Sequence, residues 1–403
     1  MMRGPMAFAL ASTAGWALAV GAAWRLRGRF YAIFAGVVLG LHTLISIGLY
    51  ESLARFEPVL YWLQVAVYVH FISLVWARLR PWWWRAAISL PGLYFAGGTM
   101  LAMPWAVAAS LGFGPWAPWL PYAVALVGVA EGVWTRRTVV DVTIDRYPVE
   151  GDRPRRHRGR GPRQERPLRL VQITDPHLGP WMSERRLRRI CERAVAREPD
   201  LVLVTGDLTT MESNARPDAL SRALAPLRAM EGRVFACRGN HDLEAPETVA
   251  VALESAGVRL LVDEAVELET EAGPVQILGI DHRWRGRRQH ILETCDRYRR
   301  PAGALRIVLL HDPGAFKHVP DGDGDIVLSG HTHGGQVGLV TLGLPWTMLR
   351  LFSSMPDHGL WAHGTNRLYV HRGTGHYGFP LRVGVPAEES ELRVHRPPST
   401  ASG

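Results

Sequence analysis

The hydrophobic residues of this chain are concentrated in its first third. Five apolar stretches follow one another there, separated by short breaks, and each is long enough to cover the ~20 residues that a membrane-spanning helix needs. A cleaved signal sequence would explain only the first of them. The pattern therefore predicts a helical membrane region over residues 1–134 with five spans, at roughly 6–24, 30–50, 58–77, 86–110 and 117–134.

From Leu168 onward, apolar runs of strand length alternate with stretches of helical period, which is typical of an α/β domain. Between the first two runs, Ser183 is the predicted N-cap of a helix. Two later runs, 368–372 and 381–395, have no helix between them and indicate a second sheet with antiparallel character. The predicted strands before them are 168–174, 201–205, 234–237, 275–280, 305–310 and 326–329.

The segment between these two regions has a different composition. Residues 135–167 mix Arg, Pro, Gly and His, apart from a short alternating stretch at 139–144, and this predicts an exposed linker. The α/β domain is then expected to cover residues 168–396, and residues 397–403 are expected to form a disordered tail.

The net charge of +9 and the pI near 9.9 arise almost entirely from arginine, since Lys317 is the only lysine. No nucleic-acid-binding signature accompanies this charge, so no nucleic-acid partner is expected. Arginine-rich and arginine-poor breaks alternate between the apolar stretches. The positive-inside rule therefore predicts an inner-membrane protein with its N-terminus outside and the α/β domain in the cytoplasm. The basic breaks contain Arg25, Arg27 and Arg29, then Arg78, Arg80 and Arg85, and finally Arg136, Arg137 and the run 153–169.

Five short polar segments follow predicted strands of the α/β domain. They are Thr174-Asp175-Pro176-His177, Gly206-Asp207, Gly239-Asn240-His241-Asp242, His311-Asp312 and Gly330-His331-Thr332-His333-Gly334-Gly335-Gln336. The carboxyl ends of neighbouring strands are where open α/β sheets build their sites. An isolated Asp-x-His or Gly-Asp is common by chance, but histidines clustered among glycines in two of the segments have no explanation in core packing.

Together these segments have the chemistry of a dinuclear metal centre. Such a centre combines oxygen and imidazole ligands and needs one carboxylate that both metals share; Asp207, which follows a glycine, is the natural candidate for it. Asn240 offers a neutral carbonyl oxygen. Seven side chains are predicted to bind two metal ions: Asp175, His177, Asp207, Asn240, His311, His331 and His333.

In the order and spacing of these segments, residues 168–396 resemble the calcineurin-like metallophosphoesterase superfamily. The chain is most similar to its membrane-tethered bacterial phosphodiesterases, which share the GHTHGGQ motif. Pro176 departs from the aliphatic residue that is usual in the family, but it removes no ligand. The resemblance implies an α/β fold, a four-layer α/β/β/α sandwich, and two divalent metal ions, Mn, Fe or Zn.

The resemblance also implies a role for each residue. Asp175, His177, Asp207 and His333 are expected to bind the first metal, and Asp207, Asn240, His311 and His331 the second. His241 is expected to contact the phosphate and protonate the leaving oxygen, with Asp242 orienting its ring.

The resulting interpretation is a membrane-anchored hydrolase that cleaves a phosphate ester, either a phosphodiester or a lipid-linked pyrophosphate, by attack of water activated by two metals. The alternative is a membrane sensor or scaffold whose α/β domain binds a nucleotide or a lipid phosphate with little turnover. The complete set of ligands favours the enzyme.

One apolar segment bears on the substrate. Residues 342–352 closely follow the GHTHGGQ motif and contain Leu, Trp, Met and Phe side chains. The segment either touches the bilayer or a lipid tail, which would indicate a lipid-linked substrate, or packs beneath the sheet. The sequence leaves both possibilities open.

Overall fold

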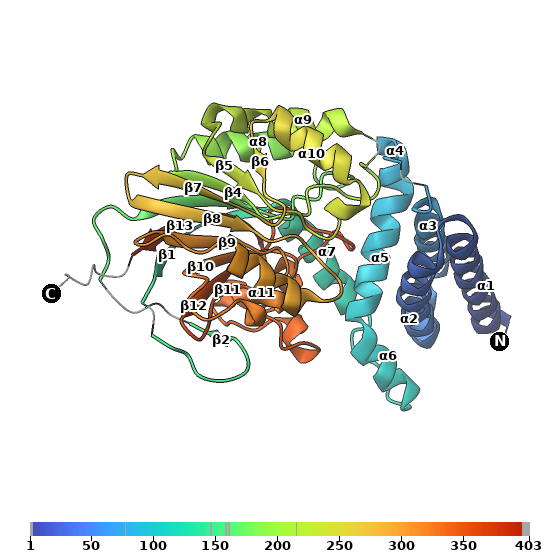
Figure 1. The fold of residues 1–403 in the computed structure, drawn as a ribbon. Coiled ribbons are helices and arrows are strands. Elements are labelled where there is room, and N and C mark those ends of the chain that lie inside the picture. Colours follow the sequence, from blue (N-terminus) through green and yellow to red (C-terminus); the bar gives the residue numbers. More distant parts are fainter. Residues whose placement is uncertain are drawn as a thin grey trace. The chain divides into compact units, whose positions relative to one another are not determined.

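The computed structural model describes residues 3–76, 78–145, 147–157, 159, 162–214 and 216–396. The predicted tail, 397–403, and part of the arginine-rich run lie outside these described residues. The chain divides into two compact units. The helical unit contains the chain up to Val133 together with the segment Tyr377–Val383, and the α/β unit contains Trp134–His376 and the chain from Gly384 onward (Figure 1).

The helical unit follows the apolar stretches of the sequence. A 3-10 turn at Ala54–Phe56 separates its second and third helices, and a π-turn at Arg85–Ser89 precedes its fifth. The helices are α1 (Arg3–Leu26), α2 (Arg29–Leu53), α3 (Glu57–Ser73), α4 (Trp82–Trp84), α5 (Leu90–Leu101), α6 (Met103–Ser110) and α7 (Leu120–Val133).

Helices α2 and α3 form a hairpin around the turn at Ala54–Phe56. His42 Nε2 lies 3.1 Å from Gln64 Oε1, and the Thr43 and Tyr68 hydroxyls are 2.6 Å apart. These residues are 22 and 25 positions apart in sequence, so α3 runs back along α2. Buried polar groups thus pair between packed helices in a largely apolar unit.

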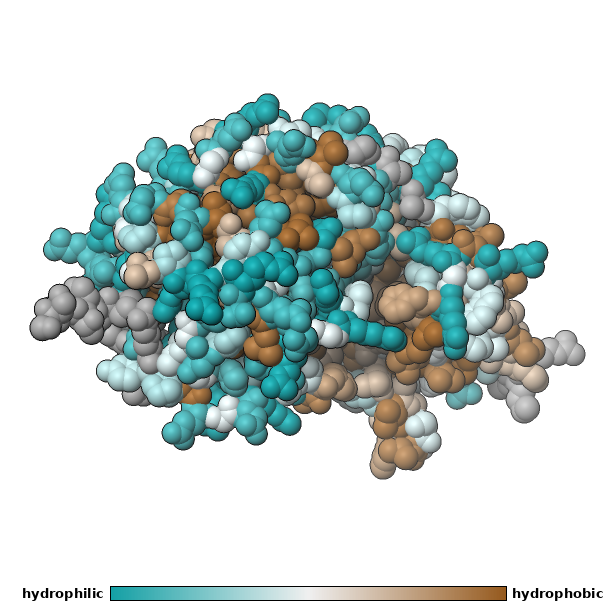
Figure 2. All heavy atoms as spheres, in the orientation of Figure 1, coloured by the Kyte–Doolittle hydropathy of each residue, from teal (hydrophilic) through white to brown (hydrophobic). Residues whose placement is uncertain are grey.

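The prediction of five spans is not confirmed. By length and composition, the described residues contain two stretches able to cross a membrane, Gly4–Leu26 and Arg29–Ser73, the second being the α2–α3 hairpin. A third is added if the pair Trp82–Leu101 and Met103–Ser110, bent by 55°, counts as one span. Helix α7 has 14 residues and is shorter than a bilayer requires. Exposed apolar side chains cover much of the surface of these helices, as on the protruding α6 in Figure 2.

The α/β unit contains two mixed sheets. The six-stranded sheet has the order β1-β13-β3-β4-β5-β6 and the seven-stranded sheet the order β2-β11-β12-β10-β9-β8-β7. In the first, the strands are β1 (Thr135–Thr143), β3 (Leu168–Ile173), β4 (Leu201–Val204), β5 (Val234–Ala236), β6 (Arg259–Leu260) and β13 (Ala387–His395). In the second, they are β2 (Arg155–Arg156), β7 (Glu264–Thr270), β8 (Gly273–Gly279), β9 (Leu305–Leu309), β10 (Ile326–Ser329), β11 (Gly359–His363) and β12 (Asn366–Val370).

Three apolar cores hold four layers together, which confirms the predicted α/β/β/α sandwich. One core lies between the sheets, where Leu170 and Leu203 meet Ile307 and Leu328. A second joins the six-stranded sheet to α8 (Glu184–Val195), α9 (Pro217–Leu224) and α10 (Pro246–Ser255). The third joins the other sheet to α11 (Arg287–Arg297) and a 3-10 turn at Pro313–His318. Ser183 caps α8 as predicted, since its side chain accepts a hydrogen bond from the Arg186 amide.

Two predictions about the edges of this unit are wrong. Residues 135–143, assigned to the exposed linker, form β1, which runs parallel to β13 over nine residue pairs, and Arg155–Arg156 form β2. The run at 381–395 was assigned to the second sheet, but β13 pairs antiparallel with β3 in the first. The linker assignment failed because arginine-rich composition hides an alternating strand whose partner lies some 250 residues away.

Candidate metal centre

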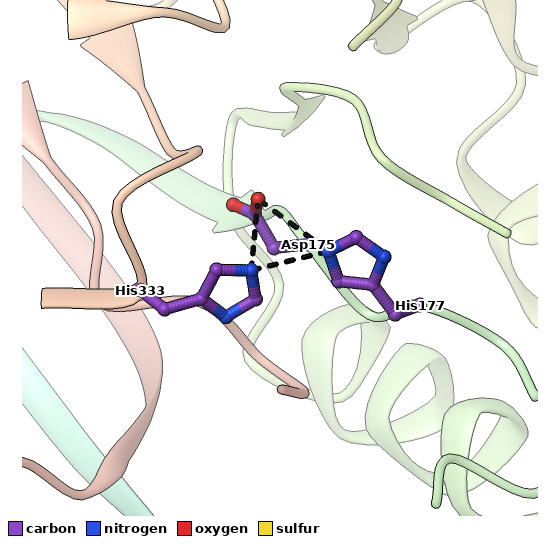
Figure 3. Close-up of side chains that lie close together, drawn as sticks. All are labelled: Asp175, His177 and His333. Carbon is purple, nitrogen blue, oxygen red and sulfur yellow. Dashed lines mark hydrogen bonds and ion pairs between the residues drawn. The ribbon is translucent and has the colours of Figure 1, made fainter. Parts of the chain in front are cut away.

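Asp175, His177 and His333 form the first of two groups of side chains that could hold a metal ion. The two imidazole Nε2 atoms are 3.1 Å apart, and Asp175 Oδ1 lies 3.5 Å from that of His333 and 3.9 Å from that of His177 (Figure 3). Asp175 and His177 follow β3, whereas His333 follows β10 of the other sheet. All three are buried and point toward one another.

The second group consists of Asp207, His311 and His331. His311 Nδ1 donates to the Thr205 carbonyl at 2.6 Å, which leaves its Nε2 to face Asp207 Oδ2 at 3.2 Å. The same Oδ2 lies 3.7 Å from His177 Nε2 in the first group. Asp207 thus lies between the two groups, in the position expected of a shared carboxylate.

Asn240 provides an independent observation in favour of a cation. Its Oδ1 is buried and has no hydrogen-bond partner among the described residues. A buried carbonyl oxygen without a donor is costly unless a ligand satisfies it. Three oxygen donors and four imidazoles also match the mixed preferences of Mn, Fe and Zn. The residues present therefore fit a pair of divalent cations.

The backbone around these side chains adopts unusual conformations. Five predicted ligands have positive φ, a region that non-glycine residues rarely occupy: Asp175 (49°), His177 (48°), Asp207 (53°), His331 (67°) and His333 (50°). Such outliers cluster at functional sites. Glycine also provides space, because a Cβ at Gly239 would lie 2.1 Å from Asp207 Oδ1 and one at Gly330 would lie 2.0 Å from Asp175 Oδ2.

Burial and mutual charge shift the pKa values of the candidate ligand side chains. Burial raises the pKa of Asp175 to about 7 and lowers those of His177 and His331 to about 3 and about 4. Burial also opposes charge on Asp207 and His311, but their attraction outweighs it, lowering the pKa of Asp207 and raising that of His311 to about 10. At neutral pH, His177 and His331 are therefore neutral, which is the form that binds metals.

The structure brings the predicted His241 to this cluster but changes the role of Asp242. The His241 ring packs edge-on against that of His177, with centroids 5.3 Å apart. Asp242 instead accepts hydrogen bonds from the amides of Asp207, Leu208 and Gly239, each at 2.8 Å. It joins the two ligand loops, and the prediction that it orients the His241 ring is wrong.

Glu244 is the residue that the sequence analysis missed. Its Oε1 lies 3.0 Å from His241 Nδ1, three positions along the turn that follows the Gly-Asn-His-Asp segment. The i,i+3 spacing of His241 and Glu244 was the available signal in the sequence, but the family resemblance implied Asp242 for this role.

Three relatives illustrate what the chain is similar to. A model of the family described as calcineurin-like phosphoesterase matches residues 168–335. An uncharacterized metallophosphoesterase of Helicobacter pylori is 29% identical over 57% of this chain, and the match spans only 60% of that relative's length. Phosphodiesterase YaeI of Escherichia coli is 29% identical, covering 57% of this chain and 82% of its own length. An uncharacterized metallophosphoesterase of Aquifex aeolicus is 32% identical, covering 55% of this chain and 82% of its own length.

Proposed function

Because the chain belongs to the calcineurin-like phosphoesterase family, we propose that it is a membrane-anchored hydrolase of phosphate esters, with phosphodiesters as the preferred class. The observation that carries this proposal is the position of Asp207, whose carboxylate lies within 3.7 Å of an imidazole from each of the two candidate metal groups. A shared carboxylate of this kind serves two-metal hydrolysis. The name of the YaeI relative, phosphodiesterase, supports the choice of substrate class.

We assign two divalent cations, Mn, Fe or Zn, to seven side chains. One would be held by Asp175, His177 and His333, the other by Asn240, His311 and His331, and Asp207 would contact both. When bound, such a pair supplies Lewis-acid activation of water and of the phosphoryl oxygens. The protein's own contribution is a buried, preorganised set of ligands on strained loops, which need little rearrangement to bind.

His241 is assigned as the general acid. Its ring packs against that of His177, beside the metal groups, and its amide donates to Asp207 Oδ1 at 2.8 Å. With Nδ1 directed at Glu244, Nε2 would be the nitrogen that gives a proton to the leaving oxygen as its bond to phosphorus breaks.

The topology we propose is an inner-membrane protein whose α/β unit faces the cytoplasm. Arg27, in the first basic break, donates to the Leu74 carbonyl beyond α3 at 2.8 Å, so the first and third breaks lie at one end of the helices. Tyr50 and Glu57, which flank the second break, pair with each other at 2.5 Å. This arrangement supports the alternation that the positive-inside rule requires.

The topology can be tested with single exposed cysteines, since the three native cysteines are buried. A membrane-impermeant maleimide should label Glu51→Cys in intact spheroplasts, and should label Arg137→Cys only after permeabilisation. The reverse pattern would place the α/β unit outside.

The activity is tested with the full chain in detergent, loaded with Mn²⁺ and assayed on bis-p-nitrophenyl phosphate and p-nitrophenyl phosphate. Hydrolysis of the diester should exceed that of the monoester, stop after treatment with EDTA and return with Mn²⁺. Turnover that persists in metal-free protein would refute the assignment.

A further inference from the structure

We propose that the segment Leu339–Phe352, here called the apolar loop, inserts into the surface of the bilayer and presents the metal centre to phosphate esters carried on lipid headgroups. This inference rests on the proposed hydrolase function and specifies where its substrate lies. It also decides between the two possibilities that the sequence leaves open for this segment.

The apolar loop is exposed and not packed beneath a sheet. Four of its large hydrophobic side chains are among the most exposed of the α/β unit: Leu342 (73%), Leu344 (51%), Leu351 (62%) and Phe352 (76%). Soluble proteins rarely expose so many large apolar side chains on one short segment unless the segment contacts a partner protein, a ligand or a membrane.

The loop holds its shape through its own backbone. The Leu339 amide donates to the Trp346 carbonyl at 2.9 Å, and the Met348 amide donates to the Val337 carbonyl at 2.8 Å. Thr347, at the base of the loop, is fully buried. The apolar side chains are therefore displayed by an ordered scaffold, which lowers the entropic cost of docking.

The base of the loop is tied to the metal centre through Asp357. The Thr347 hydroxyl donates to Asp357 Oδ2 at 2.6 Å, and the Thr332 hydroxyl, between His331 and His333, donates to the Asp357 carbonyl oxygen at 2.6 Å. A bilayer surface in contact with the apolar loop would thus lie close to the segment that contains His331 and His333. A phosphate ester on a lipid headgroup would then be within reach of the metal centre.

Two features identify this surface as a lipid bilayer. The chain carries stretches able to cross a membrane, and the α/β unit begins at Trp134, directly after α7, so it is held within reach of lipid. In addition, residues 336–356 contain one charged residue, Arg350, and no acidic one. An apolar segment with a single exposed cation suits an anionic interface.

Docking is tested with the full chain in nanodiscs of phosphatidylcholine and phosphatidylglycerol, with a fluorophore on Phe352→Cys. Val251→Cys is the matched control, because Val251 is an equally apolar, exposed residue (58%) on α10, away from the loop. Nitroxide-bearing lipids should quench the label at 352 at least about twofold more than the label at 251. Equal quenching of the two labels would overturn the proposal. This result is also expected if a second copy of the chain covers the loop.

The substrate is tested on the same nanodiscs with Leu342→Ser/Phe352→Ser and with Val251→Ser as control. On phosphatidyl-p-nitrophenol, a lipid phosphodiester, kcat/KM of the double variant should fall about tenfold, while turnover of bis-p-nitrophenyl phosphate should change less than twofold. Equal loss on both substrates, or wild-type protein that cleaves only the soluble diester, would refute the lipid substrate. If the wild-type protein loaded with Mn²⁺ cleaves neither substrate, the proposed hydrolase function is refuted. The quenching experiment would still test whether the loop docks on the bilayer.

A separate observation assigns Glu244 as a positioning residue for His241. A carboxylate on Nδ1 fixes the tautomer in which Nε2 carries the proton that is given to the leaving oxygen. Asp242 has both oxygens engaged by three backbone amides, so the ring partner is Glu244, at the end of the same 3-10 turn.

Glu244→Ala should therefore slow the hydrolysis of diesters with poor leaving groups more than that of diesters with good leaving groups. We expect about a tenfold loss for phenyl esters and about twofold for p-nitrophenyl esters, with metal content unchanged. Glu244→Asp should recover part of the loss, and His241→Ala/Glu244→Ala should be no slower than His241→Ala. Equal losses across leaving groups, or a loss of metal, would show that Glu244 only stabilises the fold.

Discussion

The two sheets contribute different chemistry to the candidate metal centre. Loops that follow β3, β4 and β5 of the six-stranded sheet supply all three oxygen ligands and one imidazole. Loops that follow β9 and β10 of the seven-stranded sheet supply imidazoles alone: His311, His331 and His333. Neither sheet contains a complete set for either metal, so the site exists only where the two sheets meet.

This division makes the contact between the sheets part of the site. Gln172 on β3 donates to the Ser329 carbonyl on β10 at 3.1 Å, and His311 donates to the Thr205 carbonyl across the same boundary. Inter-sheet hydrogen bonds thus position candidate ligands as well as stabilise the sandwich. Changes on the oxygen-rich side should have the largest effects, because that side holds Asp207, the proposed shared ligand.

The largest effect is expected from Asp207→Asn, which keeps the shape of the side chain but removes the charge shared by both metals. Activity on bis-p-nitrophenyl phosphate should fall by more than about 10³-fold, and bound Mn²⁺ should drop below two per chain. Asp218→Asn, at an exposed position of α9, is the control. If Asp207→Asn keeps the wild-type rate and metal content, the shared-ligand assignment is wrong.

A smaller loss is expected from Asn240→Ala, which removes a neutral oxygen and leaves the charged ligands in place. Turnover should fall about 100-fold at limiting Mn²⁺ and recover in part at high Mn²⁺, because only one cation is weakened. Asn240→Asp restores an oxygen and should bind Mn²⁺ better than the alanine variant in a metal titration. If the two variants bind Mn²⁺ alike, Asn240 is not a ligand.

The contact between the sheets can be tested away from the metals at Glu388. This β13 residue accepts from the Tyr369 hydroxyl on β12 at 2.7 Å and pairs with Arg372 at 3.3 Å. Burial alone would raise its pKa, but Arg372 and the other hydrogen-bonding partners hold it at about 2. A carboxyl group whose pKa is lower in the folded state than in the unfolded state stabilises the fold at pH values above its unfolded pKa. This contribution is lost as the pH falls through the folded pKa.

Glu388→Gln should therefore lower the free energy of unfolding by about 3 kcal/mol at pH 7. The difference from wild type should shrink as pH falls from about 4.5 toward about 2. Thermal melts of the full chain in detergent measure it, with Glu264→Gln on the exposed edge strand β7 as control. A difference that is constant across this range would mean that the Glu388 charge does not hold the sheets together.

The central strands, and the candidate metal-site side chains that the structure brings together, could be predicted from the sequence because both depend on local patterns. Buried strands such as Leu201–Val204 are short apolar runs, and each candidate ligand lies shortly after the end of such a strand. The edge strands could not be predicted in the same way. β7 reads Glu-Ala-Val-Glu-Leu-Glu-Thr and β1 contains two arginines, so their pairing depends on partners that composition does not reveal.

The direction of side chains within a turn was also beyond the sequence. Asp242 and Glu244 both lie close to His241 along the chain, and only the backbone of the turn decides that Asp242 faces the amides and Glu244 the ring. In the helical unit, hydropathy located the apolar helices, but it could not show that α7 is short.

The most direct test is a crystal structure of the full chain grown with Mn²⁺, with anomalous scattering measured to locate the metals. Two peaks about 3.5–4 Å apart are predicted, both touching Asp207, one beside His177 and His333 and the other beside His311 and His331. A single peak, or peaks outside the cluster formed by the two sheets, would contradict the account.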